Sequence, residues 1–164
     1  MTHSTFLGLP IVGDILPGPR GSIPGAQQPL EDLKPLMRGL LNNPAVAAFG
    51  WYQYTDPDLD APNEFKVQGP IWIRTIDADD YDHSELELGE RHPTLGDVRW
   101  DRDLGEYVRV PRPPEKDDVV RYGELLADEL ESGKFLAALA ELFGEDAEVT
   151  VSHDAIDIER FNHG

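Results

Sequence analysis

AVAAFGWYQYT (residues 45–55) and EFKVQGPIWIRTI (residues 64–76) are two apolar, aromatic-rich segments that decide the fold. They are separated by DPDLDAPN, a sequence rich in turn-forming residues. Two apolar segments joined in this way are typical of an antiparallel β-hairpin. Gly69 and Pro70 interrupt the second segment. Because proline donates no backbone hydrogen bond, this interruption predicts a bulge or a position at the edge of a sheet.

Alternation along a strand sorts the side chains of these segments onto two faces. Trp51 and Gln53 point to one face of the first strand, whereas Tyr52 and Tyr54 point to the other. These aromatic side chains could line a pocket, but strands of this composition more often belong to a core. The expected inward positions of the second segment are Phe65, Val67, Ile71 and Ile73.

The C-terminal region predicts a second hairpin. EVTVSH (residues 148–153) and AIDIER (residues 155–160) both alternate apolar with polar residues. The apolar positions expected to face one another across this hairpin are Val149 and Val151 on one strand and Ile156 and Ile158 on the other. Two shorter strand candidates precede it, at residues 98–100 and 106–110.

Residues 30–42 carry leucines at the spacing of an amphipathic helix. Pro35 is tolerated only in a first helical turn, so we expect the regular helix to start near Lys34. Two asparagines and Pro44 follow the last leucine and are expected to end the helix.

Residues 117–143 are the strongest helical segment of the chain. We expect Asp117 or Asp118 to cap its start and Gly133 to divide it in two. Gly144 is a suitable stop because glycine readily adopts the backbone conformation that ends a helix. The expected apolar faces comprise Tyr122, Leu125, Leu126 and Leu130 before the break, and Phe135, Leu136, Leu139, Leu142 and Phe143 after it.

The order of these elements predicts an α+β fold, in which an antiparallel sheet built from hairpins packs against two or three helices. Residues 1–29 hold ten glycines and prolines, a density that excludes a regular helix or a central strand. We interpret them as an extended N-terminal arm that lies on its own body or on a neighbouring subunit. Residues 30–164 are expected to form a single acidic domain.

The formal net charge is −18, and all of it arises after Thr55, because residues 1–55 hold three acidic and three basic side chains. This charge repels the phosphates of nucleic acids and of anionic membranes, which argues against direct binding to either. The chain also lacks an apolar stretch of the roughly 18 residues needed to span a membrane. A basic protein surface is the partner that the charge favours. The alternative is that the acidity serves only solubility or salt adaptation.

Two acidic loops are the candidate partner-binding surface. The first loop lies between the two strands of the aromatic hairpin, and the second follows that hairpin. Their acidic residues are Asp56, Asp58, Asp60 and Glu64 in the first loop, and Asp77, Asp79, Asp80, Asp82, Glu85, Glu87 and Glu90 in the second. Dense like charge destabilises a loop unless a cationic partner is present. A solvated loop without a partner is the alternative interpretation.

Motifs for metal binding and catalysis are missing from the sequence. The first acidic loop resembles the start of a calcium-binding loop, but Ala61 stands where glycine is required and Val67 where a bidentate glutamate is required. The five histidines form no HExxH or HxH motif, and there is no cysteine, GxSxG, P-loop or GxGxxG. We therefore predict no catalytic residue, no metal site and no cofactor.

Two segments resemble uncharacterised small proteins of tailed bacteriophages and bacteria. In those proteins an aromatic strand with a QYT tripeptide leads to a Glu–Phe strand, and a VTV strand with an Asp turn lies near the C-terminal end. The matching residues here are Trp51, Gln53, Tyr54, Thr55, Glu64, Phe65, Gly144, Val149, Val151, Asp154 and Ile158. The DPDLDAPN loop and Ala155 depart from the pattern. The resemblance implies a phage or prophage product, in the host cytoplasm or the virion, and brings no catalytic residue.

These observations lead to three functional hypotheses. The leading one is a non-enzymatic, phage-associated protein whose anionic surface binds a basic protein, as an inhibitor or a nucleic-acid mimic does. The second is a structural virion or assembly protein whose N-terminal arm laces onto neighbouring subunits, in a virion or in a homo-oligomer. The third is an enzyme that uses clustered carboxylates and a divalent metal.

Overall fold

The predicted aromatic hairpin is present in the computed structural model, where β3 (Val46–Thr55) and β4 (Phe65–Thr75) pair antiparallel. The structure describes residues 5–19, 21–55, 63–77 and 87–160. The pairing register shifts between Gly50 and Tyr52, opposite the Gly69–Pro70 interruption. β4 is also the last strand of its sheet. The predicted bulge and the predicted edge position are therefore both confirmed.

The remaining elements follow the predicted order, except that β1 and β2 were not predicted. In chain order they are β1 (Thr5–Phe6), β2 (Leu9–Gly13), the 3-10 helix η1 (Leu30–Leu33), α1 (Lys34–Leu41), β5 (Val98–Asp101), β6 (Glu106–Arg109), α2 (Pro114–Glu131), α3 (Leu136–Phe143), β7 (Ala147–Ser152) and β8 (Ile156–Arg160). One sheet has the order β1-β2-β8-β7-β3-β4, and β5 pairs separately with β6. β2 and β8 run parallel, whereas the other paired strands run antiparallel. The fold is thus α+β as predicted, with a mixed sheet.

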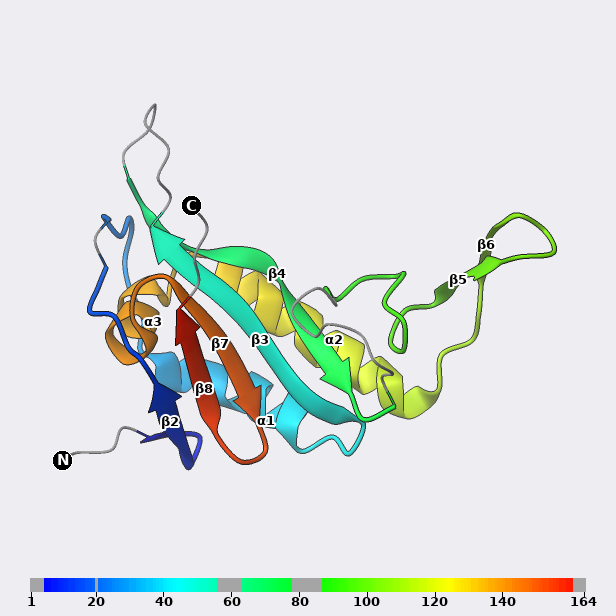
Figure 1. The fold of residues 1–164 in the computed structure, drawn as a ribbon, viewed down its shortest axis with the longest axis horizontal. Coiled ribbons are helices and arrows are strands. Elements are labelled where there is room, and N and C mark those ends of the chain that lie inside the picture. Colours follow the sequence, from blue (N-terminus) through cyan, green and yellow to red (C-terminus); the bar gives the residue numbers. More distant parts are fainter. Residues whose placement is uncertain (1–4, 20, 56–62, 78–86, 161–164) are drawn as a thin grey trace.

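All three helices pack on one face of the large sheet, which lies in front of α1 and α2 in Figure 1. Phe143 of α3 meets Trp51 of β3 edge-to-face, with ring centroids 5.8 Å apart. Gln53 points to the same face and is fully buried, and its Oε1 accepts a hydrogen bond from Trp51 Nε1 at 2.9 Å. Its Nε2 donates to the carbonyl oxygens of Leu139 and Gly144 at 2.9 and 2.8 Å. The predicted inward orientation of Trp51 and Gln53 is confirmed.

The opposite face of the sheet is mainly polar. Its half-buried or exposed side chains include Tyr52, Tyr54, Glu148, Thr150, Asp157 and Glu159. Glu148 of β7 lies directly opposite Glu159 of β8. Trp72 covers Gly50 on this face, where an added Cβ would lie 2.5 Å from the indole ring, so this close packing requires glycine.

The helix boundaries agree with the sequence in part. α1 starts at Lys34, as predicted, and Asn43 follows its end with Oδ1 accepting the backbone N–H of Ala45 at 2.9 Å. The prediction that Asp117 or Asp118 caps the next helix is wrong. α2 begins at Pro114, because proline is pre-organised for a first helical turn and needs no partner for the N–H that it lacks.

The apolar face predicted for α2 is also wrong at one position. Leu125 is 46% exposed, whereas Val119, Leu126 and Leu130 face the core. Gly123 also faces the core, where an added Cβ would lie 2.8 Å from Ile73 Cδ1 of β4. In α3 the predicted inward residues are buried, except that Leu142 is only partly buried.

The described part of residues 1–29 contacts the rest of the same chain. The exclusion of a central strand from this segment is wrong, because β2 is a short strand that pairs with β1 on one side and with β8 on the other. Leu16 forms an isolated bridge with Glu145. Gln27 accepts a hydrogen bond from the backbone N–H of Ala137 at 2.8 Å, at the start of α3. These contacts position the segment against the sheet edge and α3. Its interpretation as a separate arm stays a prediction.

Candidate functional site

Four of the predicted partner-binding residues lie in the described structure, and all four are exposed: Glu64, Asp77, Glu87 and Glu90. The others lie outside the described residues: Asp56, Asp58, Asp60, Asp79, Asp80, Asp82 and Glu85. Glu64 directly precedes β4 and Asp77 follows its end. A strand of this length separates its ends by roughly 35 Å, so Glu64 and Asp77 do not share one surface.

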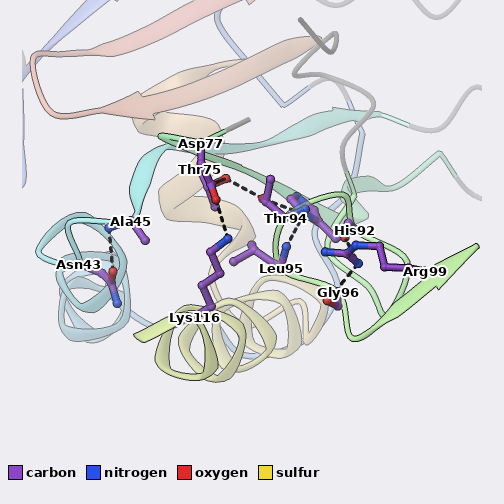
Figure 2. Close-up of polar contacts among 10 residues, drawn as sticks. All are labelled: Asn43, Ala45, Thr75, Asp77, His92, Thr94, Leu95, Gly96, Arg99 and Lys116. Carbon is purple, nitrogen blue, oxygen red and sulfur yellow. Dashed lines mark hydrogen bonds and ion pairs between the residues drawn. The ribbon is translucent and has the colours of Figure 1, made fainter. Parts of the chain in front are cut away.

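Asp77 belongs to a polar network that joins the end of β4 to α2 (Figure 2). Its Oδ1 accepts a hydrogen bond from the Thr75 hydroxyl at 2.6 Å, and its Oδ2 forms an ion pair with Lys116 Nζ at 2.7 Å. Partial burial alone would raise the pKa of Asp77, but the hydrogen bonds from Lys116 and Thr75 and the charge of Lys116 together lower it. Asp77 is therefore an anchored anion whose charge is already neutralised.

His92 is a buried histidine that shares this network. Its Nε2 lies 2.7 Å from the Ile73 carbonyl oxygen, and because a carbonyl can only accept, Nε2 carries the proton. Its Nδ1 accepts the backbone N–H groups of Thr94 and Leu95 at 3.2 and 3.1 Å. Burial, above all, lowers the pKa of His92 and keeps the ring neutral. With both ring nitrogens occupied, His92 shapes the loop after residue 87 and has no nitrogen available for a substrate.

The outward face of α2 is a second acidic surface, which the sequence did not single out. We call it the acidic helix face, and its residues are Asp117, Asp118, Arg121, Glu124, Leu125, Asp128 and Glu131. α2 as a whole holds seven acidic and two basic side chains, a net charge of −5. Glu124, Asp128 and Glu131 follow one another at helical spacing, so they form a stripe. Among the described residues, none of these three has an ion-pair partner.

A cleft of about 330 Å³ separates α2 from the base of the β5–β6 hairpin. Its charged lining residues are Glu90, Asp97, Arg109, Arg112, Asp117, Arg121 and Glu124. Each arginine is paired: Arg109 with Asp97 at 2.6 Å, Arg112 with Asp117 at 2.7 Å, and Arg121 with the neighbouring Asp118 at 3.2 Å. Glu124 is left without such a partner in the part of the chain that the structure covers, so the lining is net negative.

The β5–β6 hairpin projects from the body of the molecule (Figure 1). Its strands were predicted, but the exposure of its apolar side chains was not. Trp100, Leu104 and Tyr107 are 57, 64 and 46% exposed. The one signal in the sequence is that WDRDLGEY (residues 100–107) intersperses its apolar residues with charged residues and glycine, so no apolar periodicity marks a buried face.

Within residues 5–19, 21–55, 63–77 and 87–160, no three acidic or histidine side chains are grouped as metal ligands would be. No helix there is long and apolar enough to cross a membrane. Comparison with family models, with curated proteins and with solved structures found no match to this chain.

Proposed function

We propose that this chain is a non-enzymatic protein, of phage or prophage origin, that binds a positively charged protein partner through the acidic helix face. The observation that carries the proposal is the stripe of Glu124, Asp128 and Glu131, which have no ion-pair partner among the described residues. Like charges four residues apart on a helix repel one another by a few tenths of a kcal/mol. A cationic partner would relieve this repulsion on binding.

Two further observations support the choice of α2 over the predicted loops. Asp77 is neutralised by Lys116 at 2.7 Å, and Glu90 lies 3.7 Å from Arg109, so these two loop carboxylates already have internal partners. The stripe on α2 stands on a regular helix anchored by Val119, Leu126 and Leu130. Because the helix already holds these carboxylates in place, less conformational entropy is lost when a partner binds them.

The test is salt-dependent binding by matched variants. The partner would be isolated by pull-down from host extract at rising salt, purified, and measured by calorimetry. The helix variant carries E124Q, D128N and E131Q. The control variant carries D154N, D157N and E159Q. The control removes the same amount of negative charge, but from exposed positions on and beside β8. We expect the helix variant to weaken binding roughly tenfold and the control to change it less than about twofold.

Equal weakening by both variants would mean that only net charge matters and would contradict the assignment to α2. The absence of any partner whose affinity falls with salt would contradict the proposal as a whole. Circular dichroism of both variants should match the wild type, since the substituted side chains lie outside the core.

A further inference from the structure

The β5–β6 hairpin exposes apolar side chains that contribute nothing to the core. Seven large hydrophobic side chains are exposed in the described structure, and three of them, Trp100, Leu104 and Tyr107, lie on this hairpin. Aromatic residues and arginine are the residue types that most often dominate the energy of protein interfaces. Water contact at these positions is unfavourable, which makes their burial by a partner favourable.

The hairpin is held in one conformation by interactions of its own. Asp101 Oδ1 accepts the backbone N–H groups of Asp103 and Leu104 at 2.9 and 3.0 Å, and Gly105 takes a positive φ of 66° to close the turn. Trp100 and Tyr107 pair across the strands with ring centroids 5.0 Å apart. A two-stranded hairpin without such contacts is only marginally stable in water. Because these contacts hold the tip in one conformation, less conformational entropy is lost when a partner binds.

Neighbouring contacts fix the base of the hairpin. Arg99 Nη1 donates to the carbonyl oxygens of His92, Gly96 and Val98 at 3.1, 3.1 and 3.0 Å. The Arg91 guanidinium lies 3.8 Å from the centroid of the Tyr107 ring. The exposed aromatic pair is therefore held at a defined position relative to the segment that precedes β5.

The aromatic face leads into the cleft beside α2. Tyr107 and Arg109 are two residues apart on β6, so they point to the same face of the hairpin. Arg109 lines the cleft, and Glu124 of the acidic helix face lines its other side. The hairpin face that carries the aromatic pair therefore leads, through Arg109, into the cleft that Glu124 lines on its other side.

The geometry points to an extended, basic peptide segment of a partner protein as the occupant of this surface. An apolar side chain of the segment would pack on Trp100 and Tyr107, and lysine or arginine side chains would cross the cleft to Glu124 and Asp128. That the segment is basic rests on the proposed function. That the hairpin takes part in binding rests on the exposure of its own apolar side chains. A second copy of this chain is disfavoured, because each copy carries −18 and would bring carboxylates together.

A displayed library of random 12-residue peptides tests this inference with the intact chain. Enriched peptides would be synthesised and measured by calorimetry against W100A and L104K. The second variant changes the tip without removing the Trp100–Tyr107 pair, which guards against loss of the hairpin itself. The control is V12A, because Val12 is an apolar residue of β2 that is 42% exposed and lies outside the hairpin.

We expect the enriched peptides to combine lysine or arginine with an aromatic or aliphatic residue. W100A and L104K should each weaken their binding about tenfold, and V12A should leave it unchanged. The E124Q, D128N and E131Q variant should weaken it as well and reduce its dependence on salt.

Two kinds of result would overturn the inference. Basic peptides that respond to the helix variant but not to W100A or L104K would remove the hairpin from the interface and leave the proposed function standing. If no basic peptides were enriched, the surface would have no such occupant. Self-association in sedimentation that W100A abolishes would make a second copy of this chain the occupant. Binding to phosphatidylcholine vesicles that W100A weakens would make a lipid surface the occupant.

Discussion

His92 and Gln53 show how single buried polar residues are satisfied in this fold. Gln53 could be placed from the sequence, because alternation with Trp51 put it on the inward face. Its partners could not, since the carbonyl oxygens of Leu139 in α3 and of Gly144 just after α3 lie 86 and 91 residues further along the chain. His92 gave no such signal, because it lies in an irregular segment without periodicity. Only the backbone path of that loop explains why its ring is buried.

The first prediction concerns the pH dependence of stability. Burial lowers the pKa of His92 below its ordinary value of 6.5, the charges of Arg99 and Lys116 add to this effect, and the Ile73 carbonyl and Asp77 oppose it. The unfolded chain therefore takes up the proton first. The free energy of unfolding should be fully retained above pH 6.5 and should fall as the pH drops from 6.5 towards the folded-state pKa.

Urea denaturation at a series of pH values would measure this effect in the wild type and in H92Q. Glutamine keeps an amide donor and an acceptor but does not titrate, so its profile should be flatter below pH 6.5. Above that pH the two profiles should run parallel. Identical slopes at low pH would show that His92 does not titrate differently in the folded and unfolded states.

At the scale of elements, much of the architecture could be predicted because strands and helices leave periodic patterns. The hairpins β3–β4 and β7–β8 and the break at Gly133 were all visible in the sequence. The start of α2 was not, because a proline pair outweighed the aspartates that follow it. The acidic helix face was missed for a related reason: the acidic residues on a helix look unremarkable until its buried face has been identified.

The second prediction concerns the break between α2 and α3. Gly133 has a φ of 81°, a left-handed conformation that costs other residues about 1 kcal/mol. Space is available, since an added Cβ would lie 3.9 Å from Leu136 Cδ1. G133A should therefore lower the free energy of unfolding by about 1 kcal/mol through backbone strain alone. G89A is the control, because an added Cβ there meets no atom within 4 Å and its φ is not positive.

Chemical denaturation of both variants would measure the difference. A loss in G89A equal to that in G133A would point to a general effect of replacing glycine. An unchanged G133A would mean that the helix junction tolerates another backbone conformation at this position.

For the whole molecule, the net charge of −18 is the dominant property. Acidic residues lie on both sides of the sheet, on α2 and on β7–β8, where Glu148 directly opposes Glu159. Mutual repulsion of this kind opposes the compact state. The magnitude of the charge could be read from the sequence, but its distribution over two opposite surfaces depends on which faces the core buries.

The third prediction follows from this repulsion. Raising NaCl from about 0.05 M to about 0.5 M shortens the screening length from more than 10 Å to less than 5 Å. The melting temperature should rise over this range. The rise should be smaller in the variant that carries E124Q, D128N and E131Q, since part of the repulsion has been removed. A melting temperature that falls with salt would show that attractive ion pairs, such as Lys116 with Asp77, outweigh the repulsion.

The position of β7 and β8 in the sheet has a consequence for how the chain is made. These strands, Ala147–Ser152 and Ile156–Arg160, lie between β2 and β3, so the middle of the sheet is supplied by the two strands that are synthesised after all the others in that sheet. Until then β2 is paired on one side only, with β1, and β3 exposes an unpaired edge that carries Phe49 and Trp51. The sheet therefore cannot be completed during synthesis until residues 147–160 have emerged, and a ribosome stalled before that point would hold a partly formed sheet that is prone to aggregate.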